Sequence, residues 1–376
     1  MSNAAGIVFS NLNDNTLSRL TVDRTVAAIP FGCRYRLVDF ALSNLVNAGI
    51  FNISLVANYN YRSLAEHVGS GKDWDLARRV GGIKLISPYQ TARTPNMQFY
   101  SHHMDALKNM MEFIREIKEE NVVLCDTDHI CNIDLEAALA EHDERAADLT
   151  IVTAPYDPAF TSKNNLMMVA SREDRHIVDI VKSNVALEGR ERSIGIYIFR
   201  TQYLVVALEN AIHSNYKSLS EQIMMVKPES KRFYTYCHTG YVAGVSSFSD
   251  YYRCSIALAT DPSIRGELLA VASRPVYTKV HNSQPTVYRG GASVKNSMIA
   301  DGCVIEGTVE NSIVFRNVHV APGAVVRNSI LFGYTIIGRD AQINCVVADK
   351  SVEISAGSVL SGAPSMPFFI DKDRKV

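Results

Sequence analysis

The feature that most constrains the fold is a short motif repeated in the last quarter of the chain. The segments KNSMI (Lys295–Ile299), ENSIV (Glu310–Val314) and RNSIL (Arg327–Leu331) start 15 and then 17 residues apart. Between them a small residue stands two places before an aliphatic one near every sixth position, which is typical of a parallel β-helix. Each coil buries its aliphatic side chains against the next, so several coils are needed to form a core. Residues 285–376 are therefore predicted to form a β-helix, with a β-sandwich as the alternative.

The first 260 residues follow a different pattern, in which apolar strand segments alternate with amphipathic helices. This alternation indicates an α/β domain. We expect a strand buried on both faces at Val122–Cys125, a single helix over residues 104–120 and a β-hairpin over residues 165–183. Asp134 is the expected N-cap of a further helix. Residues 261–284, which contain two prolines and a glycine, are predicted to link the two domains.

Composition excludes several classes of partner. The 376-residue chain has a formal net charge of −1, so nothing favours nucleic-acid binding. No apolar run approaches membrane-spanning length, which argues against a membrane partner. The seven cysteines are scattered with no C-x-x-C spacing. Reduced thiols and a cytoplasmic location are the expectation.

The N-terminal region resembles a phosphate-binding site without its glycines. The apolar run Ala5–Phe9 predicts a strand, and residues 37–49 predict a helix that ends at Gly49. A phosphate is commonly bound between two such elements, by a glycine-rich loop. Here the loop reads NLNDNTLSRLT (Asn11–Thr21) and has no glycine. Side chains fill the space that phosphate needs, and Asp14 would repel it.

Three motifs identify the family that the chain resembles. IPFGCRYRLVDFALSNLVNAGI (Ile29–Ile50), TDHI (Thr127–Ile130) and SIGIYIF (Ser193–Phe199) are similar to signatures of the glucose-1-phosphate adenylyltransferase family, in that family's order. The resemblance implies a nucleotide-binding α/β domain with a mainly parallel sheet, followed by a left-handed β-helix that helps to build tetramers. It also implies transfer of an adenylyl group from ATP to glucose 1-phosphate, assisted by Mg²⁺.

The resemblance also marks six departures, all at positions that handle phosphate or metal. The loop glycines are replaced by Asn11–Asn15, and the family's loop arginine and downstream lysine by Thr16 and Val26. Ser183 stands at the lysine of the sugar-phosphate motif, and Ala243 at the second metal-binding aspartate. The last departure replaces an arginine and a glycine by Ser101 and His102.

Other family positions are kept. Tyr100, Asp105 and Ser193 match sugar or nucleotide contacts, and Lys182 stands where it could replace a lost cation. Asp128 matches the first metal-binding aspartate, but a lone carboxylate is a poor Mg²⁺ site. No cofactor is therefore expected to be required, and Mg²⁺ only if some activity survives.

Three pairs of residues near these positions are open to more than one interpretation. Asp126 and Asp128 are either a metal pair or carboxylates that face solvent. His102 and His103 are either transition-metal ligands or loop histidines, and loop histidines are favoured because no third ligand stands at metal spacing. Arg34 and Arg36 are candidates to bind a phosphate-bearing effector such as a sugar bisphosphate. The alternative is that these are surface arginines paired with carboxylates.

The pattern of losses predicts a protein that retains its family's fold without its chemistry. It resembles the non-catalytic, regulatory D-type subunit of bacterial glycogen synthesis, which associates with a catalytic subunit in a hetero-oligomer, here expected to be a tetramer. One alternative is a weakly active adenylyltransferase that uses Lys182 and Asp128. A remote alternative is an acyltransferase of the hexapeptide class, for which His319 is the only histidine inside the repeats.

Overall fold

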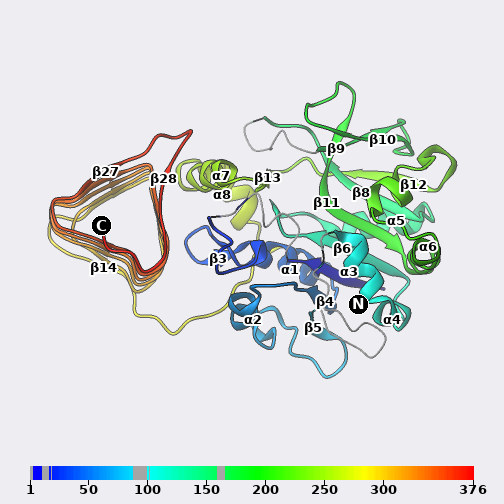
Figure 1. Ribbon diagram of the computed structural model, residues 1–376, viewed down its shortest axis with the longest axis horizontal. Helices are drawn as coiled ribbons and strands as arrows, with labels where there is room; N and C mark the ends of the chain where they lie inside the picture. The colour runs from blue at the N-terminus through cyan, green and yellow to red at the C-terminus, as the bar shows by residue number, and fades with distance from the viewer. Residues whose placement is uncertain (1–2, 11–16, 18, 88–99, 101, 159–165) are drawn as a thin grey trace.

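A computed structural model describes residues 3–10, 17, 19–87, 100, 102–158 and 166–376. It has an N-terminal α/β part and a C-terminal β-helix, with helices α7 (Phe248–Thr260) and α8 (Pro262–Leu269) at their junction (Figure 1). Within the described residues, no helix combines the length and apolar character needed to cross a membrane.

The α/β part is built on one nine-stranded sheet. Its strands run in the order β10-β9-β11-β6-β1-β4-β5, and β8 pairs with both β11 and β12. Strands β6, β1, β4 and β5 are mutually parallel, whereas β11 runs antiparallel to β6. The sheet comprises β1 (Ala4–Phe9), β4 (Asn52–Val56), β5 (Gly82–Ile86), β6 (Asn121–Asp126), β8 (Leu149–Ala154), β9 (Leu166–Ser171), β10 (Ile177–Ser183), β11 (Glu191–Arg200) and β12 (Phe233–Cys237).

Helices cover both faces of this sheet, as the alternation of strand and helix patterns predicts. One apolar cluster joins the sheet to α1 (Leu37–Asn47), α2 (Arg62–Val68) and α5 (Leu135–Glu144). A second cluster, on the other face, joins it to α3 (His103–Asn109), α4 (Met111–Arg115) and α6 (Thr201–His213). Both sets of helices bury apolar side chains against strands that are themselves buried on two faces, which is the layering of an α/β fold.

Several local predictions are confirmed and one is wrong. Helix α1 ends before Gly49, whose φ of 73° is the left-handed conformation that favours glycine. The side chain of Asp134 caps α5 by accepting a hydrogen bond from the amide of Ala137 at 3.0 Å. Strands β9 and β10 form the predicted hairpin. The single helix expected over residues 104–120 is instead two helices, because Met110 leaves the helical conformation at φ −96° and ψ 16°.

The remaining elements of the α/β part are short. They are the 3₁₀ turns η2 (Val26–Ala28), η3 (Lys72–Trp74) and η5 (Pro228–Ser230), the π turn η4 (Ser220–Met224), the hairpin of β2 (Pro30–Phe31) and β3 (Tyr35–Arg36), and the pair β7 (His129–Cys131) and β13 (Val242–Gly244).

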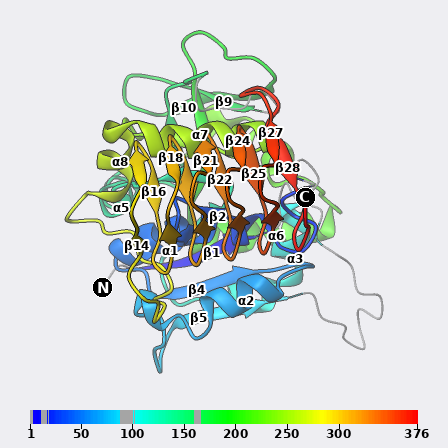
Figure 2. The same cartoon turned by 90° about the vertical axis from the view of Figure 1, so that its left-hand side faces the viewer.

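The C-terminal part is a parallel β-helix and not a β-sandwich. Its strands form three parallel five-stranded sheets, and the coils stack from yellow to red in Figure 2. One sheet comprises β14 (Val287–Tyr288), β17 (Val304–Ile305), β20 (His319–Val320), β23 (Ile336–Ile337) and β26 (Glu353–Ile354). The second comprises β15 (Ser293–Lys295), β18 (Thr308–Glu310), β21 (Val325–Arg327), β24 (Gln342–Asn344) and β27 (Val359–Ser361). The third comprises β16 (Met298–Ile299), β19 (Ile313–Val314), β22 (Ile330–Leu331), β25 (Val346–Ala348) and β28 (Phe368–Ile370).

The repeated Asn-Ser pair of the sequence motif has a structural role in the β-helix. Asn296, Asn311 and Asn328 all have φ near 47°, and their side-chain amides form a ladder of hydrogen bonds that continues to Asn344. The serine hydroxyls form a second ladder, in which each accepts from a backbone amide of the next coil. Asparagine tolerates the left-handed turn, and the ladders satisfy polar groups at the corner of every coil.

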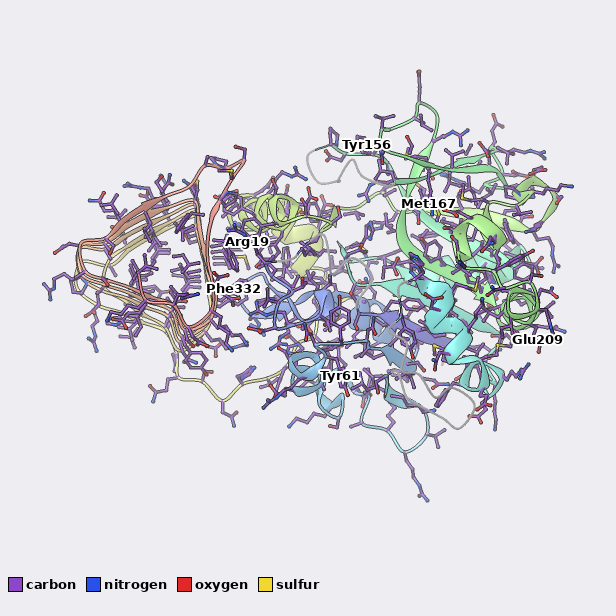
Figure 3. The ribbon with its side chains drawn as sticks, viewed as in Figure 1. Arg19, Tyr61, Tyr156, Met167, Glu209 and Phe332 are labelled. Atoms are coloured by element: carbon purple, nitrogen blue, oxygen red, sulfur yellow. The ribbon has the colours of Figure 1, made fainter. Side chains whose placement is uncertain are left out.

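The two parts are joined through a shared apolar cluster. It combines Phe31 and Tyr251 of the α/β part with Phe315 and Phe332 of the β-helix, and Figure 3 shows Phe332 on the coil face toward the α/β part. The range predicted as a linker, 261–284, is not all extended, because it begins with α8, whose Ile264 and Leu268 are buried in the same cluster. The first strand of the β-helix begins at Val287.

Candidate functional site

The parallel strands β1 and β6 end side by side at Phe9 and Asp126. In open α/β sheets a ligand usually binds in a crevice outside such strand ends, and we refer to this region below as the crevice. Two carboxylates and two imidazoles meet there. His103 Nε2 lies 2.6 Å from Asp126 Oδ1, and His129 Nδ1 lies 2.8 Å from Asp128 Oδ1. Burial lowers the pKa of His103, but the charges of Asp126 and Asp128 and the hydrogen bond to Asp126 outweigh it, so the net shift is upward. Each carboxylate thus has an imidazole as a hydrogen-bond partner.

These contacts correct two interpretations drawn from the sequence. Asp126 and Asp128 do not face solvent, because their side chains are only 13% and 12% exposed. His103 is not a loop residue: it is the first residue of α3, and its ring packs edge-on against Phe9 at 4.7 Å. The sequence alone did not indicate that His103 and His129 are bound to Asp126 and Asp128.

Among its described residues, the crevice offers few side-chain ligands to a magnesium ion. Asp128 is bound to His129, and Ala243 pairs across β13 and β7 with Ile130. Ala243 is fully buried and has no oxygen in its side chain to offer a metal. Across the described residues, no three His, Cys, Asp or Glu side chains are placed to share a metal ion.

Two positions that the family motifs would charge belong to the apolar core. Val26 is 1% exposed and Ala243 is fully buried, and both lie in the cluster that joins the α/β part to the β-helix. Leu17, within the loop Asn11–Thr21, lies in the same cluster. The positions of the expected lysine and aspartate are therefore occupied by packing that excludes water and charge.

The remaining predicted crevice residues are engaged within the chain. Lys182 forms an ion pair with Glu221 at 2.6 Å, and the Ser183 hydroxyl bonds both backbone groups of Val185. The Ser193 hydroxyl donates to Tyr197 Oη at 3.3 Å. Lys182 is thus held by the carboxylate of Glu221, 39 residues away in the sequence, and no local sequence pattern predicts this contact.

Of the other residues predicted at the crevice, the structure describes Tyr100 and Asp105 but not Thr16 or Ser101. The backbone of Tyr100 is held by the Asn58 amide, with distances of 2.8 and 3.2 Å, and Asp105 stands in the first turn of α3. Residues 11–16, with Thr16, and Ser101 lie outside the described residues.

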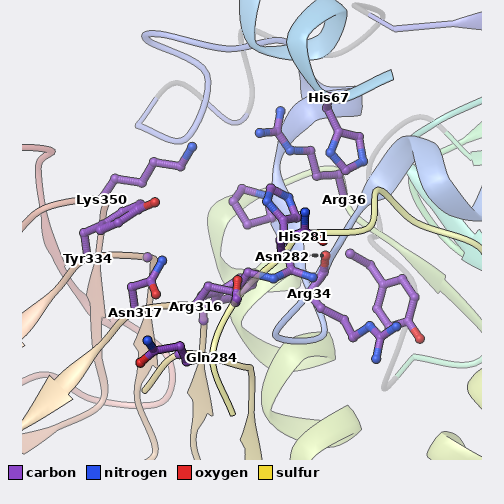
Figure 4. Close-up of a pocket in the computed structure, with 16 residues that line it drawn as sticks. Arg34, Arg36, His67, His281, Asn282, Gln284, Arg316, Asn317, Tyr334 and Lys350 are labelled. Atoms are coloured by element: carbon purple, nitrogen blue, oxygen red, sulfur yellow. Dashed lines mark hydrogen bonds between the residues drawn. The ribbon is translucent and has the colours of Figure 1, made fainter. Parts of the chain in front are cut away.

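A hollow of about 510 Å³ lies between the α/β part and the β-helix, and Arg34 and Arg36 both line it (Figure 4). Its other basic residues are His67, His281, Arg316 and Lys350. No aspartate or glutamate belongs to the part of its lining that the structure describes. We refer to it below as the interdomain pocket.

The basic residues of this pocket come from distant parts of the chain, and they differ in the hydrogen bonds and ion pairs that they form. Arg36 donates to the backbone and hydroxyl oxygens of Ser63, and burial lowers its pKa to about 10. Arg316 binds Asp301 at 2.9 Å. The exposed Arg34 guanidinium makes no ion pair with any described residue. The interpretation of Arg34 and Arg36 as carboxylate-paired surface arginines therefore fails for both residues.

Comparisons with known proteins agree with the two-part fold. The profile of the nucleotidyl transferase family matches residues 15–259, and that of the GlmU-like C-terminal hexapeptide family matches residues 280–364. The chain is 30% identical to the glycogen biosynthesis protein GlgD of Bacillus subtilis over 374 residues, which covers 98% of this chain and 95% of that protein. It is 31% identical to a glucose-1-phosphate adenylyltransferase of Thermomicrobium roseum over 380 residues, covering 100% of this chain and 87% of that enzyme. The chain belongs to the glucose-1-phosphate adenylyltransferase family of nucleotidyl transferases.

Because the chain belongs to this family, the apolar residues at two of the family's charged positions bear on its function. The chain has the α/β sheet, including the strands β1 and β6 that end at the crevice, and it has the β-helix. The two family positions that would carry a lysine and an aspartate now contribute a valine and an alanine to the interdomain core. In this member of the family, two positions of the site are thus part of the apolar core.

Proposed function

We propose that the chain is a largely non-catalytic, regulatory subunit of glucose-1-phosphate adenylyltransferase, acting in glycogen biosynthesis. The observation that carries the proposal is the burial of Val26 and Ala243 in one apolar cluster. Adenylyl transfer relies on cations and a metal to neutralise charge that develops on phosphate. Neither of these side chains can supply that charge, and restoring it would place an ion in the core.

The similarity to GlgD and to adenylyltransferases supports a place in glycogen biosynthesis and a catalytic partner of the same family. A subunit that does no chemistry acts by contact, so we propose a hetero-oligomer, in which the tetramer is the expected form. The β-helix is one candidate contact region, because its outer coils leave strand edges without a neighbour among the described residues.

The alternative of a weakly active enzyme that uses Lys182 and Asp128 has less support. Lys182 is paired with Glu221 and Asp128 with His129, so each would have to leave a partner before it met a substrate. The acyltransferase alternative is also weaker, because His319 is bound to Glu306 at 2.8 Å, and Glu306 also accepts from Arg289.

The experiment is an assay of pyrophosphate release from ATP and glucose 1-phosphate. The chain is tested alone, and then mixed with the catalytic subunit encoded in the same genome. We expect negligible turnover alone and a changed rate or activator response in the mixture. Turnover by the chain alone within about tenfold of the catalytic subunit would reject the proposal.

We also propose that the interdomain pocket binds a phosphate-bearing effector, such as a sugar bisphosphate. Arg34, Arg36 and Lys350 line this pocket without an ion pair to any described carboxylate, which favours a polyanion. Calorimetry with a hexose bisphosphate tests this, and Arg34→Gln is expected to weaken binding. Arg339→Gln, which changes an exposed arginine elsewhere on the β-helix, is the matched control. Equal affinity of both variants and the parent chain would contradict an effector role for Arg34.

A further inference from the structure

We propose that Lys350 is a modification site: a nucleophilic lysine of the interdomain pocket that becomes acylated by acyl phosphates. The inference rests on the proposed anion affinity of this pocket, and adds a covalent reaction to it. An acyl phosphate combines a phosphate group, which arginines bind, with an electrophilic carbonyl carbon, which an amine attacks. The pocket places both complementary groups around one space of about 510 Å³.

The position of Lys350 leaves its amine free to react. Lys350 follows Asp349 in the β-helix, and Figure 4 shows its side chain extending past Tyr334 on the β-helix side of the pocket. The neighbouring carboxylate is not available to it, because Asp349 accepts two hydrogen bonds from Arg24, at 2.8 and 2.9 Å, in a pair that is almost fully buried. No other described residue forms a hydrogen bond or ion pair with the Lys350 amine.

The electrostatic surroundings favour the uncharged, nucleophilic form of this amine. Partial burial, followed by the charges of Arg36 and Arg24, lowers the pKa of Lys350 from 10.5 to about 8, although Asp349 acts in the opposite direction. Lys372, near the C-terminus, also lowers it. At pH 8 about half of the Lys350 amines are therefore neutral, against well under 1% for an ordinary lysine.

The reaction balances without any further reagent. The lone pair of the Lys350 nitrogen attacks the carbonyl carbon, and the bond from that carbon to the bridging phosphate oxygen breaks. The products are an amide at Lys350 and inorganic phosphate, and the nitrogen releases its proton to water. The arginines stabilise the departing phosphate. One positive charge is lost from the pocket, so acylation should weaken the binding of an anionic effector.

The test uses the full chain and acetyl phosphate at pH 8, with acetylation at each lysine followed by peptide mass spectrometry. Lys295 is the internal control, because it lies exposed on strand β15 of the same β-helix. We expect Lys350 to react about tenfold faster than Lys295, since its larger neutral fraction outweighs the lower nucleophilicity of a less basic amine. Inorganic phosphate in excess, and Arg34→Gln, should each slow acetylation at Lys350 but not at Lys295.

An uncharged reagent, N-acetoxysuccinimide, reports the reactivity of the Lys350 amine alone, because it has no phosphate for the arginines to bind. Arg34→Gln should therefore not change the rate at which N-acetoxysuccinimide acetylates Lys350. Acetylation of Lys350 no faster than Lys295, or an acetyl phosphate rate unaffected by both phosphate and Arg34→Gln, would overturn the inference.

Binding of a hexose bisphosphate, measured separately, tells the two proposals apart. If the bisphosphate binds and Lys350 shows no preference, the modification alone is wrong. If the bisphosphate does not bind and inorganic phosphate still protects Lys350, the modification stands and the effector proposal fails. Finally, Lys350→Gln should bind the bisphosphate more weakly than Lys350→Arg, which keeps the charge.

Discussion

Val26→Lys restores the cation that the family places at this position, and the structure predicts that it destabilises the fold. Val26 is 1% exposed and lies among apolar side chains. A lysine there stays folded chiefly in its neutral form, because an ammonium is costly to bury. Keeping a lysine of ordinary pKa, about 10.4, neutral at pH 7 costs about 4.6 kcal/mol, at about 1.36 kcal/mol per pH unit.

The sign of the pH dependence distinguishes this cost from simple crowding. The pKa of the new lysine is lowered in the folded state, so the penalty is largest at low pH and shrinks as the pH approaches the unfolded value. Between pH 7 and 9 the loss in free energy of unfolding should fall by about 1.4 kcal/mol per unit. Val26→Met, which adds bulk without charge, should cost about 1–3 kcal/mol at every pH.

Urea unfolding provides the measurement. The single tryptophan, Trp74, is buried in the α/β part, so its fluorescence reports on that part. A loss below about 1 kcal/mol that did not change with pH would refute the reasoning, because it would mean that the lysine reaches water in the crevice. The same variant combined with Thr16→Arg should not release pyrophosphate, since Ala243 still lacks a carboxylate.

Three further variants test other parts of the fold. Asp349→Asn leaves the buried Arg24 guanidinium without its counter-charge and should cost about 3–5 kcal/mol, most of which Arg24→Met with Asp349→Leu should recover in urea unfolding. Burial lowers the pKa of His142 from 6.5 to about 4. The free energy of unfolding should therefore be highest above pH 6.5 and fall by up to about 3.4 kcal/mol toward pH 4, because only the unfolded chain binds the proton in this range. His142→Gln should remove this fall from the plot of unfolding free energy against pH. Gly307→Ala would place a Cβ 2.3 Å from the carbonyl oxygen of Ala324 in the next coil, so its thermal midpoint should drop, whereas Gly290→Ala, which meets no atom within 4 Å, should match the parent chain.

The parts of the fold that sequence predicts are those with a regular period or a local signal. The coil spacing predicted the β-helix, because stacked coils repeat the same small and aliphatic positions. The cap at Asp134 and the turn at Gly49 depend on a few neighbouring residues, and both are confirmed. The break at Met110 was missed because the apolar spacing continues through it, with no proline or glycine to mark it.

The candidate site was less predictable because its contacts join distant parts of the chain. Sequence could show that Val26 and Ala243 lack charge, but not that both enter one core shared with the β-helix. The partners of Asp126 and Lys182 lie 23 and 39 residues away, so no local pattern revealed them. Sequence made Arg34 one candidate for a phosphate contact, but the pocket around it depends on the placement of the β-helix against the α/β part.

The central claim is that apolar packing has replaced the groups that hold triphosphate and metal. Calorimetric titration of the chain with ATP, with and without Mg²⁺, tests it most directly. The account predicts no saturable binding in the crevice and no gain in ATP affinity when Mg²⁺ is added. One-to-one binding of ATP in the micromolar range that depends on Mg²⁺, and that Asp128→Asn abolishes, would contradict it.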